Sequence, residues 1–353
     1  MYRQLKHGFT ALRHRCYRTM HFEYWPMQVF YAPMVPVWLY YALKSRNPFY
    51  FTAVNPGIKN GGFFNNSKFD ILKQLPAKWI PKTILLKPGD HPDYSALSYP
   101  LVVKPDNGLR GKGVHIVGNK RELDLALSVE YPVLLQHYVD LPLEFGVFFY
   151  RDTRTGKPSI SGVTGKHFLT VKGDGRSTVG ELLRKMPRAS GKLRHYKEKL
   201  LKDWQVVLQE GESRIVEQIG NHNRGTLFYD ASELINMQMV DLFENIADKI
   251  NGFNWGRFDI RVASINDLYS GDQLKILEVN GSQSEPTHLY DPGYNLLHAY
   301  RVVLKHFRLN YHFARSLVKQ GISQYPSPRQ FLTELRRHLQ HSSRIQNKLK
   351  AQS

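Results

Sequence analysis

The sequence predicts a mixed helix and sheet protein of the α+β (α/β) class, followed by a basic helical tail. Its 353 residues, 42% of them apolar, are enough for two or three packed lobes around a sizeable core. Short strand patterns alternate with helical patterns through the middle of the chain. The only cysteine, Cys16, excludes an intramolecular disulfide and a multi-cysteine metal centre, so any chemistry must use oxygen and nitrogen ligands.

The individual elements follow from hydrophobic patterns and from the Gly and Pro residues that flank them. Strands are expected at 101–104, 132–136, 145–150, 257–262 and 274–279. Helices are expected at 68–73, 121–129, 179–185 and 237–250, and in the tail from Tyr300, where Pro326 and Pro328 break them. We therefore divide the chain into an N-terminal lobe (1–65), a central body (66–300) and a basic helical tail (301–353).

The net charge of +19 belongs mainly to the two ends of the chain. Residues 1–21 carry five Lys or Arg and no acid, and residues 301–353 carry eleven against the single acid Glu334. The body between them is nearly balanced. Positive ends favour an anionic partner, so one candidate function is a basic protein that binds nucleic acid or another polyanion and uses its body as a scaffold.

The segment 22–43 is rich in aromatic residues, and Glu23 is its only charge. It has the length to span a bilayer, but three prolines remove hydrogen-bond donors and kink a helix, so we do not expect a single straight transmembrane helix. Two interpretations stay open. Basic residues flank the segment on both sides, which suits an interfacial helix pair at an anionic membrane face. The alternative is that it packs as the first helix of the N-terminal lobe.

A glycine loop follows the strand that ends in Lys104. The loop contains Gly108, Gly111 and Gly113. Backbone N–H groups in such a loop can wrap a polyphosphate, and the lysine places an ammonium group close by. A turn that needs positive φ angles explains three glycines as well, so the loop by itself leaves both interpretations open.

Polar side chains lie on two strands at the far end of the body. Because side chains alternate along a strand, Asp259, Glu278 and Asn280 are expected to face one side of two neighbouring antiparallel strands. Two carboxylates and an amide oxygen are the hard ligands that Mg²⁺ prefers. Arg257, two residues before Asp259, lies on the same face and is placed to stabilise an oxyanion. The alternatives are a solvated strand face for the acids and a structural salt bridge for Arg257.

Taken together and in order, these motifs resemble the ATP-grasp superfamily, and within it the D-alanine:D-alanine ligase-like and cyanophycin-synthetase-like carboxylate-amine ligases. The resemblance covers roughly residues 68–293. It implies an ATP-grasp fold in which two α+β subdomains grip ATP. The matching stretches are 102–105 with the glycine loop, 133–139, 143–147, 256–260 and 277–281.

The resemblance also implies roles for the phosphate and metal residues. Lys104 and Lys68, the latter on the preceding helix, are expected to bind the phosphates of ATP. The glycines of the loop are expected to close over the triphosphate. Asp259, Glu278 and Asn280 are expected to hold one or two Mg²⁺ ions, or Mn²⁺ in their place.

The nucleoside end of ATP has its own implied residues. The hinge strand is expected to hold adenine around Gln136, His137 and Val139, and Glu144 is expected to accept the ribose hydroxyls. Gln136 departs from the family pattern, where glutamate is frequent, although a glutamine carbonyl can still accept a hydrogen bond. Arg224 lies in a segment similar to the Asn/Arg segment of amino-acid ligases, where it is expected to contact the substrate or the γ-phosphate.

The implied reaction joins a carboxylate substrate to an amine substrate. The carboxylate takes the γ-phosphate to give an acyl phosphate and ADP, and the amine then displaces phosphate to leave an amide. Glu285, just after the last strand motif, is placed to attract an ammonium group. We expect a cytoplasmic enzyme. If the segment 22–43 lies at a membrane, the enzyme is peripheral on its inner face, and one substrate is lipid-linked or part of an envelope polymer. Nucleic acid is not an expected partner of such a ligase.

Overall fold

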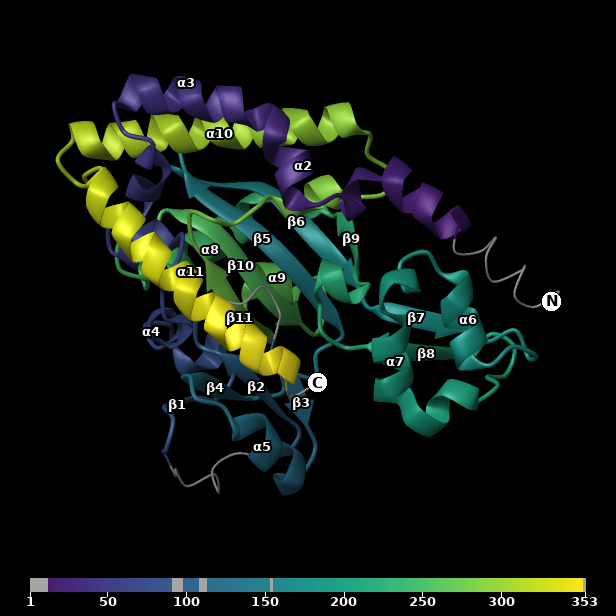
Figure 1. Ribbon diagram of the computed structural model, residues 1–353. Coiled ribbons are helices and arrows are strands. Elements are labelled where there is room, and N and C mark those ends of the chain that lie inside the picture. The colour runs from purple at the N-terminus through teal and green to yellow at the C-terminus, as the bar shows by residue number, and fades with distance from the viewer. Residues whose placement is uncertain (1–11, 91–97, 108–112, 153–154, 352–353) are drawn as a thin grey trace. The chain divides into compact units, whose positions relative to one another are not determined.

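The computed structural model describes residues 12–90, 98–107, 113–152 and 155–351. The chain forms two compact units (Figure 1). Unit 1 comprises Met1–Val35, Thr164–Asp230 and Thr287–Arg301, and unit 2 comprises Pro36–Val163, Ala231–Pro286 and Val302–Ser353. The mixed helix and sheet class predicted from the sequence is confirmed. Each expected strand and each expected helix of the central body is present, with its ends shifted by at most two residues.

The first sheet of unit 2 has four antiparallel strands in the order β1-β4-β2-β3. Alternate side chains of these strands bury an apolar core that also takes up Leu123 of the adjacent helix. That helix, α5, begins where the Asn119 side chain accepts a hydrogen bond from the Glu122 backbone, a typical N-cap. The bounds are β1 (Thr83–Leu86), β2 (Leu101–Pro105), β3 (His115–Val117), β4 (Val133–His137), α4 (Lys68–Leu72) and α5 (Lys120–Leu127).

The second sheet supplies the long strands. In unit 2 it runs in the order β11-β10-β5-β6, and the end of β6 pairs with β9 inside unit 1. Helix α8 presents an apolar face with the buried Phe243 and Ile246. The bounds are β5 (Leu143–Arg151), β6 (Pro158–His167), β9 (Leu227–Asp230), β10 (Trp255–Val262), β11 (Leu274–Asn280), α8 (Met237–Asp248) and α9 (Asp267–Ser270).

Unit 1 has its own small core between a two-stranded sheet and short helices. Its largest buried side chains are Tyr196 and Trp204, which pack with the apolar residues of both strands. Helix α6 begins with a reciprocal capping box between Thr178 and Glu181, which fixes its start. The bounds are β7 (Leu169–Lys172), β8 (Ser213–Glu217), α2 (Met27–Tyr31), α6 (Val179–Lys185) and α7 (Leu193–Leu200), with a further helical segment at 12–20.

The aromatic segment 22–43 folds as a bent series of short helices that ends in α3 (Val35–Ser45). Within unit 2, α3 runs beside α10 (Leu296–Lys319), where Tyr41 stacks on Tyr311 with 4.4 Å between ring centroids (Figure 1). No helix of the described ranges combines the length and the apolar character needed to cross a membrane.

The tail forms two long helices, α10 and α11 (Pro328–Ala351). Pro326 lies between them, as expected, but Pro328 does not break a helix. It is instead the first residue of α11, a position where the missing N–H of proline costs no intrahelical hydrogen bond. Short 3-10 helices lie at Phe22–Tyr24, Ala32–Met34, Tyr50–Val54, Lys59–Gly62, Ala77–Trp79, Ser190–Lys192, Leu201–Gln205, His222–Arg224, Ser232–Leu234 and Thr287–Tyr290.

Candidate functional site

Lys104 is a buried cation at the end of β2 in unit 2, with 8% of its surface exposed. Its Nζ donates to Gln136 Oε1 and to the carbonyl of Leu277, each at 2.9 Å. It makes no salt bridge with a carboxylate of the described residues. Burial lowers its pKa to about 8, because the more distant charges of Glu278 and Asp259 offset the desolvation only in part. Two of three ammonium donors are thus used by neutral oxygens, which leaves one for an anionic ligand.

Lys68 is the second cation of this site, at the first turn of α4. Its Nζ lies 3.1 Å from the carbonyl of Pro105 and 3.7 Å from Glu278 Oε1. Asp106 fixes the start of that helix, because its Oδ1 accepts hydrogen bonds from the Ser67 hydroxyl and the Phe69 backbone. The helix start and the strand end are therefore tied together. The two lysines predicted to bind phosphate lie on these tied elements.

Four polar side chains lie together on the paired strands β10 and β11. Asp259 is the cross-strand partner of Glu278, and Arg257 is the partner of Asn280. Arg257 donates to both carboxylate oxygens of Asp259, at 3.1 and 3.0 Å, and Asn280 Nδ2 donates to Oδ2 at 2.9 Å. Gly146 on the neighbouring strand makes room, since a Cβ there would lie 3.0 Å from Arg257 Cδ. The alternation predicted from the sequence thus brings these groups together.

Arg257 forms a salt bridge with Asp259, two residues along the same strand. A structural salt bridge was one of the two interpretations of this residue. Burial would lower the pKa of its guanidinium, but Asp259 raises it above its ordinary value. Its Nη1 also donates to the carbonyl of Glu285 at 3.0 Å. These bonds fix the orientation of Asp259 and place the Glu285 segment beside it.

The donor set suits a hard cation. Asp259 and Glu278 face each other across the strand pair, and the Glu278 side chain is 34% exposed, so it is open to a ligand. Within the described part of the chain, no group of three or more His, Cys, Asp or Glu side chains has a geometry that could hold a metal ion. A divalent cation here would therefore use the two carboxylates and the Asn280 amide together with oxygens from its substrate, which is the usual habit of Mg²⁺.

Buried polar atoms without a hydrogen-bond partner lie in the segments around this cluster. They are Asn107 Oδ1, Ser282 Oγ and Glu285 Oε1, with partners counted among the described residues. Such atoms are costly in a folded protein unless water or a ligand completes them. Glu285 is of most interest, because it is an acid whose backbone carbonyl accepts a hydrogen bond from Arg257.

The residues predicted to hold the nucleoside already make hydrogen bonds with other residues of the protein. Gln136 bridges Lys104 and the Thr83 hydroxyl, and His137 Nε2 lies 2.9 Å from Ser98 Oγ. The buried Arg261 binds Glu144 Oε2 at 3.0 Å and the Val139 carbonyl at 2.6 Å. Burial would lower the pKa of Arg261, but Glu144 raises it.

Sequence reasoning missed Arg261 and Asp106. Arg261 stands two residues after Asp259, so the alternation that joined Arg257 to Asp259 predicts its face as well. Asp106 carries no comparable signal, because its partners Ser67 and Phe69 are distant in sequence.

Of the three predicted loop glycines, Gly108 and Gly111 lie outside the described residues. Gly113 has a φ of 70°, and a Cβ there would lie 3.1 Å from Cγ of Pro105. A positive φ favours glycine over other residues, so the local backbone explains this position.

Arg224 belongs to unit 1, not to the cluster in unit 2. It lies on a 3-10 helix that Asn221 caps. Its Nη1 is 3.7 Å from Oε2 of the fully buried Glu217. Lys199 donates to the other Glu217 oxygen at 3.0 Å. Arg224 is therefore one member of a cation set around a buried acid.

Comparison with solved structures gives distant matches. The first is a bifunctional glutathione synthetase from Pasteurella multocida, 16% identical over 68% of this chain and 36% of that chain, with a TM-score of 0.37. D-alanine–D-alanine ligase from Bacillus anthracis, complexed with ATP, is 13% identical over 70% and 66% of the two chains, with a TM-score of 0.40. VanG D-Ala:D-Ser ligase from Enterococcus faecalis is 13% identical over 68% and 61%, with a TM-score of 0.37.

This chain spans about a third of the glutathione synthetase and less than two thirds of each of the other two proteins. No family model matches the sequence, and no curated protein matches it.

Proposed function

We propose that this protein is an ATP-dependent carboxylate-amine ligase that forms an amide bond through an acyl phosphate. The observation that carries the proposal is the buried ammonium of Lys104, which makes no salt bridge with a described carboxylate but feels the charges of the Asp259–Glu278 pair. A cation and a cation-binding carboxylate pair in one place form a site for a magnesium-bound polyphosphate.

In the proposed complex, Lys104 and Lys68 neutralise the phosphate charge of ATP. Lys104 uses its remaining donor, and Lys68 turns from Glu278 toward the phosphates. Asp259, Glu278 and Asn280 would hold Mg²⁺, which would supply charge neutralisation at the phosphate oxygens. Phosphoryl transfer needs positioning and charge more than covalent help, so no nucleophilic side chain is required.

The reaction proceeds in two balanced steps. A carboxylate oxygen of the first substrate attacks the γ-phosphorus, and the bond to the bridging oxygen breaks to release ADP. The nitrogen of the amine then attacks the acyl carbon, the carbon–oxygen bond to phosphate breaks, and the amine loses a proton to solvent. Arg257 is positioned to stabilise the oxyanion of this second step. The orphaned carboxylate oxygen of Glu285 is positioned to accept from the incoming amine.

The test is an ADP-release screen over paired carboxylates and amines, with the mass of the product as the readout. With ¹⁸O-labelled carboxylate we expect one labelled oxygen in inorganic phosphate. Formation of AMP and pyrophosphate would show an adenylate mechanism instead. Absence of turnover with all pairs, together with absence of ATP binding, would favour the scaffold function predicted from the basic ends.

The metal set is tested separately by Glu278→Gln. We expect the Mg²⁺ concentration that half-saturates ATP binding to rise about tenfold, because a carboxylate ligand is lost. Asp272→Asn is the matched control, since Asp272 is an exposed acid in the turn between the same two strands. Equal Mg²⁺ dependence in the two variants would remove Glu278 from the metal site.

We also propose that the enzyme binds peripherally to an anionic membrane through α3. Leu39, Tyr40 and Leu43 of this helix are exposed, and Lys44 lies 4.5 Å from the Tyr40 ring. An exposed apolar face with cations beside it suits the interface of an anionic bilayer. Liposome flotation should require anionic lipid, and Leu43→Glu should abolish it while Leu125→Glu, an exposed leucine on α5, does not. Flotation that Leu43→Glu leaves unchanged would contradict this attachment.

A further inference from the structure

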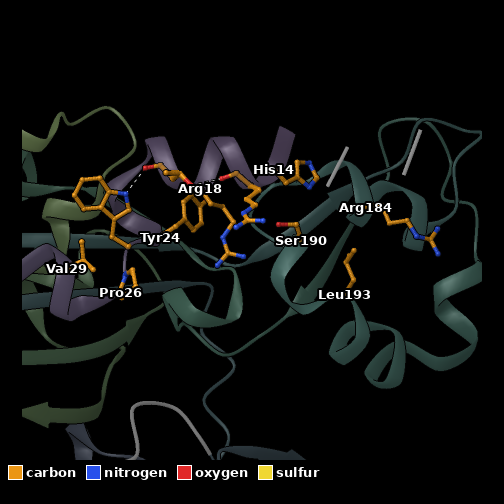
Figure 2. A pocket seen from close by; sticks show the side chains of 11 residues that line it. His14, Arg18, Tyr24, Pro26, Val29, Arg184, Ser190 and Leu193 are labelled. Atoms are coloured by element: carbon orange, nitrogen blue, oxygen red, sulfur yellow. Dashed lines mark hydrogen bonds between the residues drawn. The ribbon is translucent and has the colours of Figure 1, made fainter. Parts of the chain in front are cut away.

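Unit 1 contains a pocket of about 790 Å³ that no residue of the candidate site in unit 2 lines (Figure 2). Its walls come from the helical segment 12–20, from the start of α2 and from the stretch between α6 and α7. This volume is in the range of small-molecule sites. The pocket belongs to unit 1 alone, so its properties do not depend on the site in unit 2.

The charged wall of the pocket is wholly cationic. Arg15, Arg18 and Arg184 line it, and no Asp or Glu does. Within the described part of the chain, neither Arg15 nor Arg18 makes a salt bridge with a carboxylate. Arg18 is held in place, since its guanidinium lies 5.5 Å from the Tyr24 ring centre and the missing side chain of Gly191 leaves room for its Nη1. A positioned guanidinium without an acid is a binding group for phosphate or carboxylate.

The other wall of the pocket is apolar. Trp25, Val29 and Leu193 line it, and the Trp25 indole is fixed by a 2.7 Å hydrogen bond from Nε1 to the Thr19 carbonyl. A ligand that fills this pocket therefore carries an apolar group beside its negative charge.

His14 gives an independent sign of a missing ligand. It lines the pocket, only 4% of its surface is exposed, and its Nε2 is buried without a hydrogen-bond partner among the described residues. Burial lowers the pKa of His14 below its ordinary value, although a hydrogen bond with the Lys185 backbone raises it in part. A neutral imidazole with one unused nitrogen can make one more hydrogen bond, and a bound polar group would complete it.

We propose that this pocket binds an organic anion, a carboxylate or a phosphate ester, that carries an apolar chain or ring. The arginines bind the anionic group, His14 completes its hydrogen bonding, and Trp25 with Val29 and Leu193 covers the apolar part. The inference goes beyond the proposed ligase function, because it needs neither ATP nor metal.

The test uses the full-length protein without nucleotide and anilinonaphthalene sulfonate, a fluorescent aromatic anion, as the probe. Arg18→Gln should weaken its binding about tenfold, the usual effect of losing one charge-assisted hydrogen bond. Val29→Trp should block binding by filling the pocket, at a position that is half exposed and so tolerates a larger side chain. Arg13→Gln is the matched control, because Arg13 lies on the same helical segment and does not line the pocket.

Displacement then identifies the anion. Octanoate, a carboxylate, and octyl phosphate, a phosphate ester, are added to displace the bound probe. The stronger competitor identifies which of the two anion classes the pocket prefers. The proposal is overturned if neither displaces the probe, if Val29→Trp binds it as the parent does, or if Arg13→Gln loses as much affinity as Arg18→Gln. Circular dichroism of each variant confirms that it is folded.

Discussion

Lys104 in unit 2 and Glu217 in unit 1 are both buried charges, but the fold treats them in opposite ways. Glu217 has no exposed surface, and Lys199, His195 and Arg224 lie within 3.7 Å of it. Burial would raise the pKa of this carboxyl, but the neighbouring His195 ring together with the charges of Lys199 and Arg224 brings it to about 2. Lys104 has only neutral oxygens, and burial lowers its pKa to about 8.

The difference separates a structural charge from a functional one. A buried charge that makes salt bridges within the fold contributes to holding the fold, whereas a buried charge without a salt bridge can gain one when a ligand binds. Unit 1 repeats the contrast on its own. Glu23 is neutralised by Arg188, which donates to both of its oxygens at 3.1 and 2.9 Å, whereas Arg18 in the nearby pocket has no such acid among the described residues.

The largest expected effect is at Lys104. Lys104→Ala should weaken the binding of magnesium-ATP about 100-fold, because it removes a buried charge-assisted contact to phosphate. Lys73→Ala, at an exposed lysine directly after α4, should leave affinity within about twofold. Isothermal titration calorimetry measures both. If folded Lys104→Ala protein binds ATP as tightly as the parent, an uncompensated buried charge does not mark the nucleotide site.

The next effect is on stability and concerns Glu217. Glu217→Gln should lower the free energy of unfolding by about 2 kcal/mol at pH 7, because Lys199 and Arg224 lose their shared buried partner. The folded pKa lies below the ordinary value of 4.5. The stabilisation is therefore fully present above about pH 4.5 and is lost as the pH falls toward 2.

Urea unfolding of the parent and of Glu217→Gln at pH 7 and pH 3 checks this. The difference between the two proteins should shrink at pH 3. Glu198→Gln is the control, since that exposed acid pairs with Arg194 on the surface. Equal stability of the parent and Glu217→Gln at pH 7 would show that Glu217 does not stabilise the fold, and would contradict its assignment as a structural charge.

A third effect is the pH dependence of nucleotide binding. Lys104 must carry its proton to bind phosphate, and its pKa in the free protein is about 8. Affinity for ATP should therefore fall about tenfold between pH 7 and pH 9, because binding must then include protonation. In Lys104→Arg the side chain stays charged, so this step should disappear. A step of equal size in Lys104→Arg would assign the titration to another group.

The sequence predicted the parts of the site that depend on local geometry. Alternation along β10 and β11 placed Asp259, Glu278 and Asn280 together, and the antiparallel pairing of these strands agrees with that expectation. The contact of Lys104 with the carbonyl of Leu277 joins segments 173 residues apart, and no periodicity encodes such a distance. The pocket in unit 1 was missed for the same reason, since His14 and Leu193 belong to distant segments.

The smallest expected effect concerns Arg224, for which the sequence predicted contact with the substrate or the γ-phosphate. Its place beside Glu217 favours a structural role, because its charge is part of the set that neutralises a buried acid. Arg224→Gln should lower the free energy of unfolding by about 1 kcal/mol, since Lys199 and the His195 ring remain beside Glu217. Arg224→Lys retains the charge, so both its urea midpoint and its turnover should stay close to those of the parent. A tenfold loss of turnover in Arg224→Lys with unchanged stability would instead require the planar guanidinium at the substrate, and would show that a residue that neutralises a buried acid can also act in catalysis.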